Sequence, residues 1–145
     1  MTETKENAIA LELLDAAVTA EDISSSAAEN IRIWLTNSQY GDYVPAIRHH
    51  LEQQEFEELN RAFWKVLEFG TGGRRGTMFE IGSAVINQRT MGESAAGLAA
   101  YVQGQAPPGS QCSCAIAYDT RHGSVSFAQQ SAQIMAAAGF KVYFL

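Results

Sequence analysis

The chain has 145 residues, of which 46% are hydrophobic and 18% charged, and its formal net charge is −6. This composition is that of a globular domain with a core, and it excludes a disordered chain. The acidic balance argues against non-specific nucleic-acid binding. Since the sequence shows neither a membrane-spanning apolar run nor a secretory signal, we expect a cytoplasmic protein.

The first 68 residues are expected to form helices, because apolar residues recur in them at helical spacing. A turn at Asp42 and Pro45 leads into a further short helix, 46–53, with His49 and His50. Adjacent helical side chains point about 100° apart, so we do not expect these histidines to share a metal. The three apolar stripes are Ile9, Leu13 and Ala17; Ala27, Ile31, Trp34 and Leu35; and Phe56, Leu59, Phe63 and Leu67.

The sequence changes character after Glu68. Residues 69–86 are rich in glycine, lack a helical period and have room for a short strand at 77–81. Thr90 and Glu93 have the spacing of a capping box, which predicts a helix from Thr90 to Val102. The charge changes too: residues 1–68 carry a net −8, whereas residues 69–145 carry a net +2.

The last segment predicts a βαβ unit. An apolar strand at 112–119 is followed by a tight loop and an alanine-rich helix, which Ser124 or Ser126 would cap and Gly139 would end. A second strand follows at 141–145, and such a unit has parallel strands and a right-handed crossover. Two cysteines, Cys112 and Cys114, would share one strand face as reduced thiols. Because the chain stops inside the last strand, we expect a piece of a longer protein.

The stretch FGTGGRRGT, residues 69–77, is the first candidate anion site. Its four glycines could present backbone N–H groups as a nest, and Arg74 or Arg75 would add charge-assisted bonds to phosphate oxygens. The stretch lacks the Gly-Lys-Ser/Thr of a nucleotide P-loop and the context of a dinucleotide fingerprint. The alternative is a flexible turn whose arginines pair with the acidic helices.

The stretch YDTRHGS, residues 118–124, is the second candidate. It would lie at the carboxyl end of a parallel strand and before a helix, where ligands of α/β sheets bind. Asp119 could be a base, a metal ligand or a brace for its own loop. Arg121 could bind an anion or pair with Asp119 or a neighbouring acid. His122 could cap the helix or hydrogen-bond a phosphate, and the alternative is a surface residue. We find no nucleophile with a partnered base in the sequence.

Three motifs in order resemble the α-D-phosphohexomutase superfamily. FGTGGRRG resembles the family's F-G-T-A-G-L-R-G, and IGSAVINQRTMGESAAGLAAYV resembles the segment that follows it. AIAYDTRHGSVSFAQQSAQIMAAAGFKVYFL resembles the G-Y-D-T-R-H motif with its helix and strand. The preceding helical segment is similar to the branch that contains phosphopentomutases and related phosphoglucomutases and phosphomannomutases. Gly72 and Arg74 stand where the family usually has Ala and an apolar residue.

The resemblance implies a four-domain enzyme. In it a phosphoserine exchanges a phosphoryl group with a hexose or pentose phosphate, and Mg²⁺ on an acidic loop assists. Arg75 would be the catalytic arginine of the first motif, with Thr71, Gly73 and Arg121 as further phosphate-binding residues. The phosphoserine and Mg²⁺ loops belong to later parts of the family pattern, so we expect no metal ligands and no activity in these residues alone.

We therefore predict an α/β protein. A helical N-terminal extension, 1–66, precedes a partial phosphohexomutase domain I, 67–145, that contains a parallel βαβ unit. The expected partners are a sugar phosphate and the other domains of the same enzyme, with no role for nucleic acid or membrane. The alternative is a stand-alone phosphate- or phosphosugar-binding or structural module without catalysis.

Overall fold

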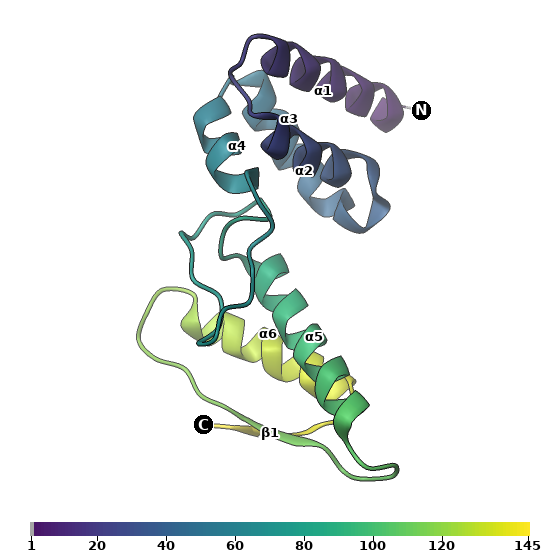
Figure 1. The fold of residues 1–145 in the computed structure, drawn as a ribbon, viewed down its shortest axis with the longest axis vertical. Coiled ribbons are helices and arrows are strands. Elements are labelled where there is room, and N and C mark those ends of the chain that lie inside the picture. The colour runs from purple at the N-terminus through teal and green to yellow at the C-terminus, as the bar shows by residue number, and fades with distance from the viewer. Residues whose placement is uncertain (1) are drawn as a thin grey trace. The chain divides into compact units, whose positions relative to one another are not determined.

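The computed structural model of the protein describes residues 2–145, with side chains from Glu6 onward. The chain divides into two compact units, residues 1–87 and residues 88–145 (Figure 1). Its mixed helices and parallel strands confirm the predicted α/β class.

The first unit contains the four predicted helices, which are α1 (Thr2–Thr19), α2 (Ser25–Thr36), α3 (Val44–Glu52) and α4 (Phe56–Phe63). A 3-10 helix, η1 (Ser38–Tyr43), which was not predicted, lies between α2 and α3. Ser24 caps α2, because its Oγ accepts the Ala27 N–H at 3.3 Å. Pro45 lies in the first turn of α3, where its missing N–H costs no hydrogen bond. Local sequence therefore accounts for the start of each of these two helices.

The core of this unit corrects the predicted face of α1. Ala17 is buried as predicted, but Ile9 and Leu13 are 53% and 36% exposed, whereas Leu14 is fully buried. The stripe predicted for α2 is buried as expected, and Trp34 stacks on Tyr40 with ring centroids 4.5 Å apart. The phase of α1 could not be read from its own sequence because apolar residues occur on more than one side of that helix.

The end of α4 also differs from the prediction. The stripe predicted helix to Leu67, but α4 ends at Phe63. Leu67 is nevertheless buried, because it lies in an extended segment whose backbone N–H donates to the Ser83 carbonyl at 2.7 Å. Its burial depends on a partner sixteen residues away, which a local period cannot reveal.

The second unit is the predicted βαβ arrangement preceded by a helix. Its elements are α5 (Gln88–Gln105), β1 (Ser113–Ile116), α6 (Ser124–Ala137) and β2 (Lys141–Phe144). β1 and β2 are parallel, with Ser113 opposite Lys141 and Ile116 opposite Phe144. This confirms the predicted parallel pair.

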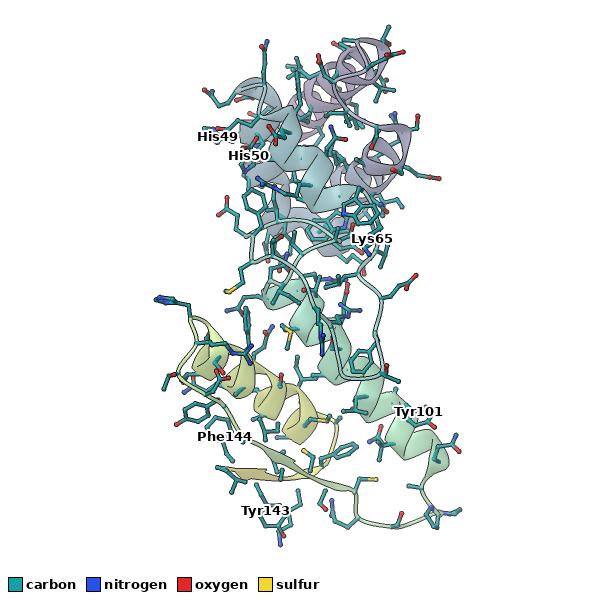
Figure 2. The ribbon with its side chains drawn as sticks, turned by 60° about the vertical axis from the view of Figure 1, so that its left-hand side comes forward. His49, His50, Lys65, Tyr101, Tyr143 and Phe144 are labelled. Atoms are coloured by element: carbon teal, nitrogen blue, oxygen red, sulfur yellow. The ribbon has the colours of Figure 1, made fainter. Side chains whose placement is uncertain are left out.

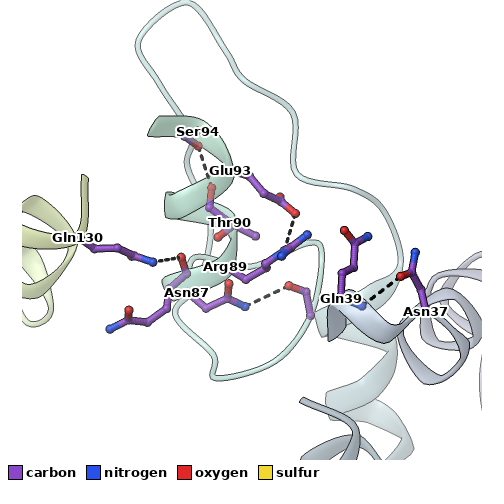
Figure 3. A network of polar contacts seen from close by, with 10 residues as sticks. Asn37, Gln39, Asn87, Arg89, Thr90, Glu93, Ser94 and Gln130 are labelled. Carbon is purple, nitrogen blue, oxygen red and sulfur yellow. Dashed lines mark hydrogen bonds and ion pairs between the residues drawn. The ribbon is translucent and has the colours of Figure 1, made fainter. Parts of the chain in front are cut away.

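The start of α5 is not the predicted capping box. The helix begins at Gln88, two residues before Thr90, and Glu93 instead accepts from Arg89 Nε at 2.8 Å (Figure 3). Gln130 of α6 donates to the Gln88 carbonyl at 3.0 Å. The first turn of α5 is thus held by an ion pair and by a neighbouring helix.

The caps of α6 were predicted correctly at one end only. Gly123 is the N-cap residue and makes no side-chain cap, while the Ser126 hydroxyl donates to the Gly123 carbonyl at 2.9 Å. At the other end Gly139 has φ +86°, and the N–H groups of Gly139 and Phe140 donate to Ala136 and Met135. This is a Schellman motif, in which glycine takes a left-handed conformation.

One face of the strand pair packs on α5 and α6. Ala99, Met135 and Phe140 are buried there, with half-buried Cys112 and Cys114 alongside. The two cysteines therefore share one face, as predicted, and both are free thiols. Tyr143 projects from the other side of the strands, away from the helices (Figure 2).

Candidate functional site

The glycine-rich loop, which we define as residues 68–76, projects from an anchored base. On one side the Leu67 N–H donates to Ser83, and on the other the Ile86 N–H donates to the Thr77 carbonyl at 2.8 Å. The predicted strand at 77–81 is reduced to a single parallel bridge between Met78 and Ile86. The residues 81–86 thus fix both ends of the loop.

This anchor is packed tightly on α4. Gly82 has φ +118°, and a Cβ at this position would lie 2.4 Å from the Ala62 carbonyl oxygen. The Ala84 N–H donates to that same oxygen at 2.9 Å, and Ile81 and Val85 are buried. The run of small residues around Gly82 is the sign of this close approach in the sequence.

The tip of the loop is a tight turn. The N–H of Gly70 donates to the Gly73 carbonyl at 3.2 Å, and the N–H of Gly73 donates to the Gly70 carbonyl at 3.1 Å. Gly73 has φ +99°, which favours glycine. Because each of these two N–H groups bonds to the other residue's carbonyl, two of the four N–H groups of the predicted nest already have a partner within the turn. Thr71 and Gly72 are exposed at the centre of the turn.

Arg75 follows this turn and is exposed. Its Nη2 lies 3.9 Å from where a Cβ on Gly72 would stand, so the guanidinium lies against the turn. Within residues 6–145, Arg75 forms no ion pair with an acidic side chain. The alternative in which it pairs with the acidic helices is therefore wrong for Arg75. Arg74, by contrast, is half-buried.

The second candidate stretch, residues 118–124, forms a loop that is held by hydrogen bonds to Asp119. Its Oδ1 accepts the Arg121 backbone N–H at 3.1 Å and its Oδ2 accepts Arg121 Nε–H at 2.8 Å. The Asp119 N–H in turn donates to Ser124 Oγ at 3.1 Å. The hydrogen bond from the Arg121 backbone N–H lowers the pKa of Asp119 most, and the side chains of Ser124 and Arg121 lower it further. Of the three roles considered for Asp119, the loop brace is the one that these contacts form.

The predicted site residues fall on two units. Thr71, Gly73 and Arg75 share one loop of the first unit, and Arg121 belongs to the second, beside exposed His122. No group of three or more histidine, cysteine or acidic side chains among the described residues could hold a metal ion. The described residues therefore do not offer a set of ligands for Mg²⁺. No helix in the described part of the chain could span a bilayer.

The guanidinium of arginine matches the geometry of phosphate, and parallel α/β sheets bind ligands outside the carboxyl ends of their strands. A family model described as phosphoglucomutase/phosphomannomutase, alpha/beta/alpha domain I, matches residues 66–145. The chain belongs to this family.

The chain is also similar to curated mutases. It is 37% identical to a phosphoglucomutase from Staphylococcus aureus over 97 residues, which cover 67% of this chain and 17% of that protein. It is 26% identical to the phosphoribomutase of Saccharomyces cerevisiae over 125 residues, which cover 86% of this chain and 20% of that protein. The chain thus spans at most a fifth of the length of these relatives. No solved structure was found to match it.

Proposed function

We propose that the chain forms the first part of a phosphosugar mutase that moves a phosphoryl group within a hexose or pentose phosphate. The observation that carries this proposal is the family match over residues 66–145, which includes the glycine-rich loop with Arg75 and the loop at 118–124 with Arg121. The similarity to a phosphoglucomutase and to a phosphoribomutase is consistent with either sugar class. The domain boundary would fall between residues 66 and 67, and the whole enzyme would act in carbohydrate metabolism in the cytoplasm.

In this proposal Arg75 acts by charge and position. A guanidinium stays protonated at working pH, so it serves as neither acid nor base, but it can hold a phosphate by two parallel hydrogen bonds. Its exposure and lack of an acidic partner among residues 6–145 leave it able to do so. Thr71 would offer a hydroxyl and Gly73 a close backbone approach on the same loop. Arg121 would add a second phosphate contact.

The chemistry itself would need other parts of the enzyme. The transfer would proceed through a phosphoserine supplied outside residues 1–145, and Mg²⁺, held there too, would neutralise charge on the moving phosphoryl group. We therefore expect the 145-residue chain to bind sugar phosphate weakly and to lack mutase activity. Its partners in the enzyme would be the other domains.

Calorimetry of this chain with glucose 6-phosphate and ribose 5-phosphate tests the proposal. Arg75→Ala should weaken binding roughly 10- to 100-fold, since a hydrogen bond to a charged group contributes about 1.5–3 kcal/mol. Arg61→Ala is the matched control, because Arg61 is an exposed arginine of the same unit that lies on α4. Equal affinities for the wild type and Arg75→Ala, or no heat with either sugar phosphate, would contradict the proposal.

A further inference from the structure

The contact between Asp119 and Arg121 does more than close a turn. One carboxylate oxygen accepts the backbone N–H of Arg121 and the other accepts its Nε–H, so the same carboxylate bonds to both the backbone and the guanidinium of Arg121. Ser124 Oγ accepts the Asp119 N–H and thereby ties the brace to the first residue of α6. Asp119 itself is half-exposed at 50%, which means that solvent weakens the purely Coulombic part of the pair.

The guanidinium is held by one edge only. Nε–H bonds to Asp119, whereas the two terminal nitrogens form no hydrogen bond to any described residue. The Arg121 side chain is 86% exposed, so this second edge faces solvent. A guanidinium presents parallel N–H groups along an edge, and that geometry matches two oxygens of a phosphate.

We propose that Asp119 is a positioning residue, which presents the outer edge of the Arg121 guanidinium to phosphate. This inference rests on the proposed function, in which Arg121 contacts the phosphate of the substrate. An unbraced arginine would lose much of its rotamer freedom on binding, and a braced one has already lost it. Asp119 would touch neither the substrate nor the transferred group.

The direction in which phosphate affinity changes when Asp119 is replaced tests the positioning role. A carboxylate close to the site repels phosphate, so if Asp119 were only a nearby charge, its removal would tighten phosphate binding. If Asp119 positions Arg121, its removal should weaken binding instead. Asp119→Asn separates the two, because the amide oxygen can still accept the Arg121 backbone N–H while the partner of Nε–H is lost.

The experiment is a titration of the 145-residue chain with inorganic phosphate, followed by NMR. The Arg121 Nε–Hε resonance reports the brace, and the Gly123 backbone amide reports binding in every variant. We expect Asp119→Asn to raise the phosphate Kd roughly three- to tenfold, the effect of freeing one long side chain. It should also move the Nε–Hε resonance before phosphate is added, which a role in folding alone would not require. Arg121→Lys keeps the charge but has no edge to position.

Asp15→Asn is the matched control. Asp15 also pairs with an arginine, Arg32, at 2.7 Å and is also exposed, so this variant removes the same charge from a pair outside the loop. Its phosphate Kd should stay within twofold of the wild type. In the Arg121→Lys background, Asp119→Asn should no longer weaken binding, since the two residues act as a unit.

Each outcome bears on a different claim. An unchanged or lower Kd in Asp119→Asn, with the wild-type Gly123 amide responding to phosphate, would overturn the positioning role and leave the proposed function standing. A wild-type loop that does not respond to phosphate would remove Arg121 from the proposed site, and the positioning role with it. A rise in Kd that persists in the Arg121→Lys background would show that Asp119 acts through another residue.

Discussion

Replacing Gly82 by alanine should loosen the base of the glycine-rich loop. The added Cβ would lie 2.4 Å from the Ala62 carbonyl oxygen and 2.8 Å from the Ala62 Cβ, distances at which backbone must move. The φ of +118° is also unfavourable for any residue with a Cβ. Backbone strain of about 1–3 kcal/mol and overpacking of about 1–3 kcal/mol can be relieved together by one shift, so we expect a loss of about 2–4 kcal/mol.

Urea unfolding followed by tryptophan fluorescence measures this loss. Both tryptophans of the chain, Trp34 and Trp64, lie in the first unit, so their emission reports the unit that contains Gly82. Gly41→Ala is the control, because a Cβ at Gly41 would have nothing within 4 Å and its φ is not positive. A free energy of unfolding for Gly82→Ala within about 0.5 kcal/mol of the wild type would refute the tight anchor, since that is the range of ordinary surface substitutions.

Three further predictions concern the loops and the helical core. Gly72→Ala should fold like the wild type and keep its sugar-phosphate affinity in calorimetry, because the new Cβ would stand 3.9 Å from Arg75 Nη2, an ordinary contact. The pKa of Asp119 lies below its ordinary value of 3.8, chiefly because of the Arg121 backbone hydrogen bond, so the stability that this carboxylate contributes is present above that pH and is lost as the pH falls through the lowered pKa; the Arg121 Nε–Hε resonance should move over that lower pH range. His50→Ala should lower the midpoint of thermal unfolding and cost about 1–3 kcal/mol, since a buried ring and its 2.5 Å contact with the Glu55 carboxylate are lost; an unchanged midpoint would show that this contact contributes nothing.

The elements that could be predicted from sequence are those whose determinants are local. The βαβ unit followed from an apolar strand, an alanine-rich helix and Gly139, and each of these acts within a few residues. α2 followed from one apolar stripe. The extended segment at Leu67 could not be predicted, because the Ser83 carbonyl that holds it is distant in sequence.

In the candidate site, too, the sequence predicted some features and not others. Residue types indicated Arg74 or Arg75 in the glycine-rich stretch and Arg121 in the second stretch, and the resemblance of FGTGGRRG to the family motif then selected Arg75. They did not reveal that Gly70 and Gly73 would bond to each other, which removes two donors from the predicted nest. A glycine N–H can serve an anion or close a turn, and only the fold decides which.

The two exposed arginines would contribute to phosphate binding in different ways. Arg75 has no acidic partner among residues 6–145, so its full charge attracts an anion, but its side chain must still be ordered when the anion binds. Arg121 is already ordered by Asp119, but that carboxylate offsets part of its attraction. Salt screens long-range attraction more than it screens direct hydrogen bonds. Within the proposed function, Arg75 therefore supplies mainly the salt-sensitive part of the affinity, and Arg121 supplies mainly the geometry.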